Sequence, residues 1–225
     1  MSIKKLLAAT FAAVSAFASA QAATVTFDST GDSNTLYFLE SADGATLDTR
    51  ISFLLTSLSA GSATFSVSVN NASFGPGQNT FMSFGIDVVS PTLTGASATG
   101  IWDAGTGVTL AGAQKVDLCV YSANKCAGGS INSGLGEGLI STFSLTLNTS
   151  GNFLTSGVTF NSPFSAKWQG VGLSGQSYET NDGCFGTADC GSTTTNVPEP
   201  GTLALVGMAL LGAGVSRRRL AARAA

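Results

Sequence analysis

The clearest pattern in the chain is a regular alternation of apolar and polar residues. In the stretch ATFSVSVN at 63–70, Phe65, Val67 and Val69 alternate with hydroxyl residues, and STFSLTLNT at 141–149 repeats the pattern. Successive side chains of a β-strand point to opposite faces, so this period of two separates apolar side chains from hydroxyls. Both stretches therefore predict strands with one face in a core and the other in solvent.

Other stretches predict further strands. The run FMSFGIDVV at 81–89 is almost continuously apolar, which is typical of a strand buried on both faces. Shorter candidates are TLYFLE at 35–40, TRISFLLTSL at 49–58 and KVDLCVY at 115–121. Segments rich in Gly, Ser and Asn between them indicate turns, and only the two termini have long segments of helical period. The sequence thus predicts an all-β fold, a single antiparallel β-sandwich or jelly-roll-like domain over residues 23–190.

The N-terminus has the features of a secretory signal peptide. Lys4 and Lys5 precede a mostly apolar segment at 6–17, which is too short to span a bilayer. Small residues follow in two A-x-A patterns, with Ala20 and Ala22 as candidate cleavage positions. We expect residues 1–22 to be removed on export, so that the mature chain begins at Ala23.

The C-terminus has three parts in sequence. After a polar linker at 191–196 comes the motif VPEP, formed by Val197, Pro198, Glu199 and Pro200. An uncharged, mostly apolar segment at 201–216 predicts a short transmembrane helix. Arginines end the chain at Arg217, Arg218, Arg219 and Arg223. Such a cluster stays on the cytoplasmic side, which places the body outside the inner membrane. An ordinary tail anchor would have the same topology.

This arrangement resembles the PEP-CTERM sorting signal of Gram-negative bacteria, and the resemblance covers residues 197–225. It implies recognition by an exosortase, a membrane transpeptidase-like enzyme, with cleavage near the Pro-Glu-Pro after a transient stay in the inner membrane. Proteins of this kind are typically exported by organisms that make exopolysaccharide and biofilm, so the implied destination is the cell surface or extracellular matrix. The same tail is also known as an ice-binding protein C-terminal domain, a label that describes the tail and gives no evidence on the body.

Charge and cysteine content constrain the body further. Its four basic and twelve acidic residues give a net charge of −8, which argues against nucleic acid as a partner. An even number of cysteines in an exported chain suggests disulfides. Three pairings are possible, and short loops favour Cys119–Cys126 and Cys184–Cys190. A metal site built from all four cysteines is the alternative, although their spacing is wide for zinc.

The body offers little catalytic chemistry. The chain has no histidine, which excludes Ser-His-Asp and Cys-His catalysis. The glycine-rich GLGEG at 134–138 lacks the lysine of a phosphate loop. A carboxylate pair for glycoside hydrolysis would be sought first among three acids in or near predicted strands, Asp87, Asp103 and Asp117. We therefore expect a non-enzymatic protein without a cofactor.

Binding chemistry has three candidates. Oxygen-rich turns that could hold calcium contain Asp28, Asp32 and Asn34, and Glu179, Asn181 and Asp182. Rings that could stack on sugars, or fill the core, are Trp102, Trp168, Tyr37, Tyr121 and Tyr178. The Thr-x-Thr pairs of an ice-binding face occur only in isolation, at Thr24 and Thr26 and at Thr92 and Thr94. The sequence favours an exported structural or adhesive protein that contacts exopolysaccharide. The alternative is a carbohydrate-binding module, with or without calcium, and ice binding is a less favoured third.

Overall fold

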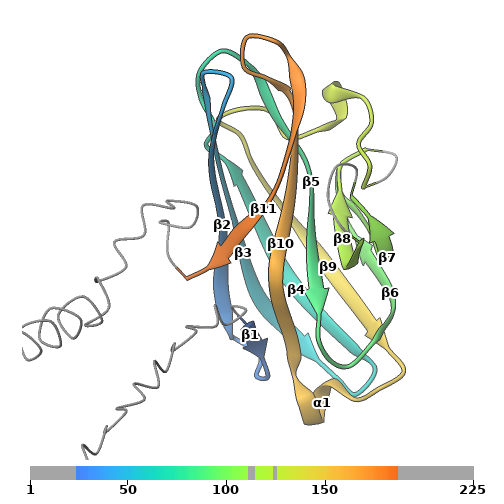
Figure 1. Cartoon of the computed structure of the whole chain (residues 1–225). Helices are drawn as coiled ribbons and strands as arrows, with labels where there is room; N and C mark the ends of the chain where they lie inside the picture. The colour runs from blue at the N-terminus through green and yellow to red at the C-terminus, as the bar shows by residue number, and fades with distance from the viewer. Residues whose placement is uncertain (1–23, 111–114, 124–125, 187–225) are drawn as a thin grey trace, which may run out of the picture.

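A computed structural model of the chain describes residues 24–110, 115–123 and 126–186 (Figure 1). The predicted signal peptide, polar linker and C-terminal sorting signal lie outside these residues. Eleven strands make up most of the described part: β1 Thr24–Phe27, β2 Ser33–Ala42, β3 Ala45–Leu58, β4 Ser62–Asn71, β5 Gly77–Val88, β6 Leu93–Ala98, β7 Asp103–Thr109, β8 Lys115–Tyr121, β9 Ile140–Thr149, β10 Val158–Val171 and β11 Gln176–Phe185. The described helical segments are one short turn each, η1 Ile131–Ser133 and α1 Phe153–Ser156.

The strands form one antiparallel sheet in the order β6-β9-β4-β3-β2-β11-β10-β5-β8-β7, with β1 added beside β10. The predicted all-β antiparallel fold is confirmed. The two layers of the predicted sandwich, however, are not separate sheets. Strand β11 pairs with β10 on one side and with β2 on the other, which joins the layers into a continuous, nearly barrel-shaped sheet. The end strands β6 and β7 follow each other in the chain and lie in contact, which brings the two edges of the sheet together (Figure 1).

The core lies inside this curved sheet and is dominated by phenylalanine. The rings of Phe27, Phe53, Phe65 and Phe160 pack against one another with centroids 5.2 to 6.4 Å apart, mostly edge to face. Edge-to-face packing is favoured by the ring quadrupole and adds to the gain from burying the rings. The alternating residues of β4 contribute as predicted, because Phe65, Val67 and Val69 are fully buried.

Strand β5 departs from the one-faced pattern and carries a second, smaller core. Its residues from Asn79 to Ile86 are all buried, as the continuous apolar run predicted. On the outer side of β5 and β8, Leu110, Val116, Cys119 and Cys126 pack into a separate cluster. Gly85 makes room for this cluster, because a Cβ there would lie 2.9 Å from methyl carbons of Leu110 and Val116. One wall of the barrel is therefore two layers thick.

The helical segments of the described residues are short. None of their helices is long and apolar enough to cross a bilayer. The span predicted at 201–216 lies outside them.

Candidate functional site

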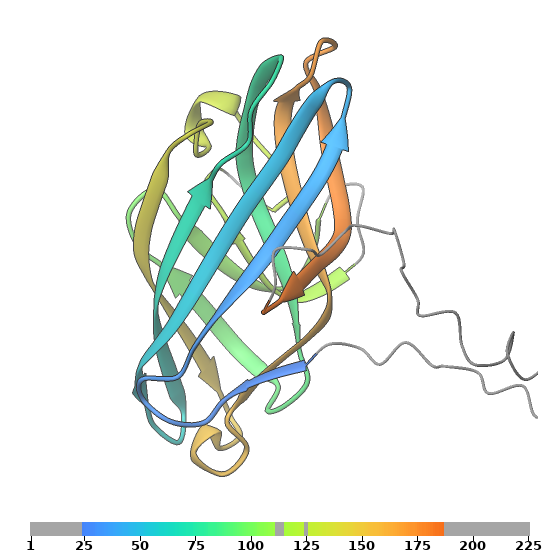
Figure 2. The ribbon, with the colours of Figure 1, turned by 90° about the vertical axis from the view of Figure 1, so that its left-hand side faces the viewer.

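A groove of about 610 Å³ lies on the outer face of β2, β3 and β4. Figure 2 shows these three strands side by side on the face turned to the viewer. The groove is lined by Ser33, Asn34, Thr35, Tyr37, Ser52, Phe53, Leu54, Ser66, Ser68 and Gly186. The alternation recognised in the sequence produces this lining, because the apolar half of each strand faces the core and leaves the hydroxyls outside.

Strand register aligns the hydroxyls into a row across the sheet. Thr35 pairs with Ser52, Ser52 with Ser68, and Ser68 with Thr142 of β9. Thr35 and Ser52 share a hydrogen bond of 2.9 Å between their side-chain oxygens. Neither Ser66 nor Ser68 uses its hydroxyl for a hydrogen bond to the part of the chain that the structure describes. These two groups therefore keep both a donor and acceptor positions for a ligand.

An aromatic ring and an ion pair flank the hydroxyl row. Tyr37 stands opposite Arg50 in the β2–β3 register, and both side chains point outward. Arg50 donates from Nη2 to Asp48 Oδ2 at 2.8 Å and from Nε to Asp48 Oδ1 at 3.2 Å. This two-point contact with the carboxylate raises the pKa of Arg50 further above its already high ordinary value. The pair neutralises itself, so the border of the groove adds little net charge.

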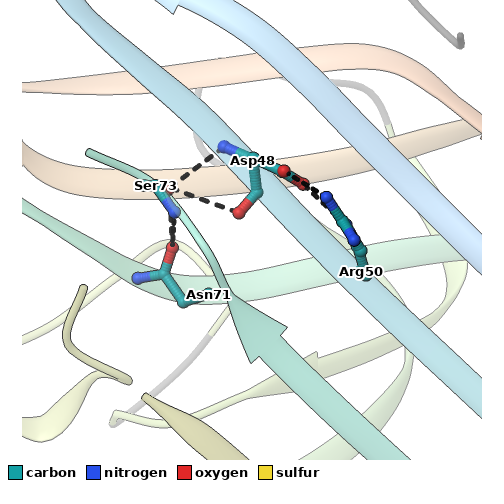
Figure 3. A network of polar contacts seen from close by, with 4 residues as sticks. All are labelled: Asp48, Arg50, Asn71 and Ser73. Carbon is teal, nitrogen blue, oxygen red and sulfur yellow. Dashed lines mark hydrogen bonds and ion pairs between the residues drawn. The ribbon is translucent and has the colours of Figure 1, made fainter. Parts of the chain in front are cut away.

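A buried polar network holds the Asp48 segment in place (Figure 3). The Asp48 backbone N–H donates to Ser73 Oγ at 3.1 Å, and the Ser73 hydroxyl donates to Asn71 Oδ1 at 2.6 Å. Asn71 in turn donates from Nδ2 to the backbone carbonyls of Asn79 and Leu135, both at 2.9 Å. Ser73, Asn71 and Asn79 are almost fully buried. The network joins the end of β4, the start of β5 and the loops that contain Ser73 and Leu135 to β3, which restrains the strand that carries Arg50.

Of the three acids predicted as a hydrolytic pair, the structure brings two together. Asp87 and Asp117 lie on the adjacent strands β5 and β8, and the Val88 backbone N–H donates to Asp117 Oδ2 at 3.1 Å. Burial and, second, the charge of Asp117 raise the pKa of Asp87. Across β5, Asn161 of β10 pairs with Asp87 and has a buried Oδ1 without a hydrogen-bond partner in the described chain. The two acids belong to neighbouring strands of one wall and do not face each other across a cleft.

The third acid, Asp103, has a different environment. Its Oδ1 accepts a hydrogen bond of 2.8 Å from the Ala104 backbone N–H, and its Oδ2 accepts one of 3.3 Å from the Tyr121 hydroxyl. The neighbouring carboxylate also contributes, after burial, to a raised pKa of Tyr121. Asp103 therefore serves a local contact on the β7–β8 hairpin.

The two turns proposed as calcium ligands are occupied by the chain itself. Asp32 Oδ2 accepts hydrogen bonds of 2.9 Å from the backbone N–H groups of both Asp28 and Ser29. These bonds, with Ser29 the stronger influence, lower the pKa of Asp32. In the second turn, Asn181 accepts from the Ser165 hydroxyl at 2.7 Å. Within the described residues, no three Asp, Glu or Cys side chains gather as a metal-binding group.

The predicted sugar-stacking aromatics separate into core and surface. Trp102 and Trp168 are buried, and the Trp168 ring packs 5.3 Å from Phe81. Tyr178 packs against Trp168, while Tyr121 packs against the second cluster. Among the five rings, Tyr37 is the one that lines the groove.

One ion pair was not anticipated from the sequence. Lys167 of β10 is 4% exposed and pairs with Glu179, its direct neighbour on β11. The segment after Cys126 covers it, since a Cβ on Gly128 would come within 2.9 Å of the Lys167 side chain. The sequence signal was weak: a single lysine in the stretch SAKWQG at 165–170.

One of the two predicted disulfides is confirmed. Cys119 and Cys126 are bonded, with their Cα atoms 6.2 Å apart, as predicted. Cys184 is also disulfide-bonded. Its predicted partner, Cys190, lies outside the described residues, so that pairing stays a prediction.

Comparison with known proteins identifies the C-terminus. Residues 196–219 match the PEP-CTERM protein-sorting motif, a range that includes VPEP and Arg217, Arg218 and Arg219. The motif defines the class of protein, an exported protein targeted to exosortase. The chain is thus a PEP-CTERM sorting-motif protein with an all-β body. No curated protein and no solved structure matches the chain.

Proposed function

We propose that this protein is a structural or adhesive component of the cell surface or extracellular matrix and contacts exopolysaccharide. The observation that carries the proposal is the sorting motif at 196–219, which implies export and exosortase processing. The body supports it, because a nearly closed antiparallel sheet around a phenylalanine core is a rigid scaffold with a broad outer surface.

The two ends of the molecule have separate roles in this proposal. The body folds outside the membrane, where the Cys119–Cys126 disulfide forms. The segment 201–216 holds the chain in the inner membrane with Arg217, Arg218 and Arg219 on the cytoplasmic side until the exosortase acts near VPEP. Every residue that lines the groove precedes VPEP in the sequence, so cleavage there leaves the groove on the exported portion.

The proposal includes no catalysis. The whole chain lacks histidine, and Asp87 and Asp117, two of the acids considered for hydrolysis, are on adjacent strands of one wall. A general acid and a nucleophile for glycoside hydrolysis need to lie on opposite sides of a bound sugar. The alternative function, a carbohydrate-binding module with a defined site, is favoured by one observation, the Tyr37 ring in a hydroxyl-lined groove. Ice binding is the third possibility, and it requires a flat face, whereas this face is hollowed.

The test is the intact mass of the protein isolated from membrane and extracellular fractions of its own host. We expect an extracellular species that begins at Ala23, ends near VPEP and is lighter by the hydrogens of two disulfides. Substitution Glu199→Gln keeps the size of the side chain and should retain the protein in the membrane fraction. A wild-type protein that stays in the membrane with Arg223 attached would contradict the sorting step and leave a simple tail anchor.

A further inference from the structure

We propose that the groove on β2, β3 and β4 is the binding site for an uncharged polysaccharide chain. This inference deepens the proposed function and rests on it, since it specifies the surface and the ligand class. The site has three parallel rows across the strands. The middle row is Thr35, Ser52 and Ser68, and the outer rows place Tyr37 on one side and Leu54 on the other.

The charge of the lining selects the class of ligand. All ten described residues that line the groove are uncharged, although the body carries a net charge of −8. Arg50, which stands beside Tyr37 in the strand register, is bound to Asp48. An acidic polysaccharide or a nucleic acid would be repelled by the surrounding carboxylates and would find no cationic side chain in the lining. A neutral polymer is not repelled by the carboxylates and needs no cationic side chain.

The hydrogen-bonding capacity of the lining matches sugar hydroxyls. Each serine or threonine hydroxyl donates one hydrogen bond and accepts others, as a sugar hydroxyl does. Ser66 and Ser68 are half-buried in the hollow, and their hydroxyls have no partner within the described chain. Partly desolvated groups that lack a partner gain more from a ligand than fully hydrated ones do.

The apolar contacts complement the hydroxyls. Tyr37 offers the face of its ring, and Leu54 is 41% exposed on the opposite side of the hydroxyl row. The C–H faces of a sugar ring can pack on such surfaces while its hydroxyls reach the polar row. The two apolar positions lie on either side of the row, separated by about two residue steps each, roughly 7 Å. A chain of rings that runs along the strands would therefore meet Tyr37, the hydroxyl row and Leu54 in turn.

The groove is also preorganised. Ser52 and Ser68 alternate with Phe53 and Val67, which are fully buried in the core. The backbone at these positions is fixed by pairing on both sides, from β2 to β9. Binding therefore needs little ordering of the protein, which lowers the entropic cost of each contact with a polymer.

The test uses the exported protein purified from the host and the host's own exopolysaccharide, separated by anion exchange into neutral and acidic fractions. We expect binding to the neutral fraction in affinity electrophoresis. Tyr37→Ala should weaken it about tenfold, and Ser68→Glu, which places bulk and charge in the row, by at least as much. Tyr37→Phe should retain most of the binding, because it keeps the ring.

A matched control separates the groove from the rest of the surface. Ser133 is exposed on η1, away from β2–β4, so Ser133→Glu adds the same charge without entering the groove. Its binding should equal that of the wild type, and thermal unfolding of every variant checks the fold. Binding to the acidic fraction alone, or binding that survives Tyr37→Ala and Ser68→Glu, would overturn the groove assignment.

Failure of this inference is distinguishable from failure of the proposed function. Correct processing by intact mass, combined with binding that survives Tyr37→Ala and Ser68→Glu, would overturn the groove and leave the proposed function intact. Correct processing without binding to either fraction would overturn the groove and the exopolysaccharide contact together and leave only export and sorting. Inhibition of ice recrystallisation that disappears in Ser68→Glu would assign the same groove to ice and so overturn the polysaccharide inference.

Discussion

The two walls of the barrel treat their outer faces differently. The wall of β2, β3, β4 and β9 has a single layer, with apolar side chains inside and hydroxyls outside. The wall of β5, β8 and β10 carries a second layer, in which the cluster around Leu110, the Cys119–Cys126 disulfide and the Lys167–Glu179 pair are buried. The outer face of the β2–β3–β4–β9 wall is open to partners, whereas the outer face of the β5–β8–β10 wall is covered by its second layer.

The difference originates in the local sequence. ATFSVSVN alternates strictly, whereas FMSFGIDVV has apolar residues or glycine at most positions. Where the second face of a strand is apolar, burying it requires another layer, and Leu110, Val116 and Cys126 supply part of that layer. Where the second face is hydroxyl, water satisfies it and no cover is needed.

The largest contrast is expected from the two ion pairs. Glu179→Ala leaves the Lys167 ammonium buried without its partner, and we expect a loss of about 3 kcal/mol in the free energy of unfolding. Asp48→Ala breaks the exposed pair with Arg50, whose side chain is 47% exposed, and should cost less than about 1 kcal/mol. Urea unfolding followed by the fluorescence of Trp102 and Trp168 measures both. Equal losses in the free energy of unfolding would contradict the view that the covered wall contributes more to stability than the open one.

The disulfide should contribute almost as much. It closes a loop with a sequence separation of 7. For so short a loop, the replacement of Cys119 and Cys126 together by alanine should lower the free energy of unfolding by about 2–3 kcal/mol. The groove lies on the other wall, so its polysaccharide affinity should not change. A simultaneous loss of binding, measured by affinity electrophoresis on folded protein, would show that the two walls are coupled.

A pair of glycine substitutions compares the walls directly. Gly85→Ala inserts a methyl group 2.9 Å from Leu110 and Val116, and overpacking of this kind costs about 1–3 kcal/mol. Gly95→Ala, on β6, meets nothing within 4 Å and should stay within about 0.5 kcal/mol of the wild type. Thermal unfolding of the two variants measures both losses of stability. A larger loss at Gly95 would reverse the assignment of the covered wall.

The smallest expected effect is a change in how the free energy of unfolding depends on pH. Burial and the Asp117 charge raise the pKa of Asp87 above 3.8, so its ionisation is harder in the folded protein than in the unfolded chain. This group therefore lowers the free energy of unfolding as the pH rises from about 3.8 through its raised pKa. Asp32 has a lowered pKa, and its contribution is present above its ordinary pKa and is lost as the pH falls. Asp87→Asn should stabilise the protein at pH 7, and urea titrations between pH 3 and 7 test this. A destabilised variant would contradict the sign.

The sequence predicted the strands more completely than their assembly. Alternation identified β4 and β9, and the continuous run identified β5, because periodicity directly reports which face is buried. It could not show that β11 joins both halves, since pairing between distant strands leaves no local periodicity. The Cys119–Cys126 disulfide was accessible because its loop is short.

The candidate site was predicted only in its parts. Tyr37 was one of five aromatic candidates, and its selection required knowing that Trp102 and Trp168 fill the core. The alignment of Thr35, Ser52 and Ser68 depends on the register of three strands, which no single stretch encodes. The calcium turns failed for a related reason, because Asp32 turns back to bind its own backbone. The sequence identified the residue types that can bind a ligand, whereas strand register determines which of these residues lie side by side.

Strand β11 also lies on the path of mechanical tension between the groove and the C-terminal tail. It is the last strand of the described residues, and it pairs with β10 along much of its length. With β2 its backbone is in register at Cys184–Tyr37 and Phe185–Leu36, beside side-chain hydrogen bonds from Tyr178 and Thr180 to Glu40. When the tail end is held and a polymer pulls on the groove, tension runs from β2 through that short seam into β11. This seam has fewer paired residues than the β2–β3 and β3–β4 ladders, so we expect it to separate first. Under force the barrel would open there, at the junction of its walls, while the strands that form the groove stay paired with one another.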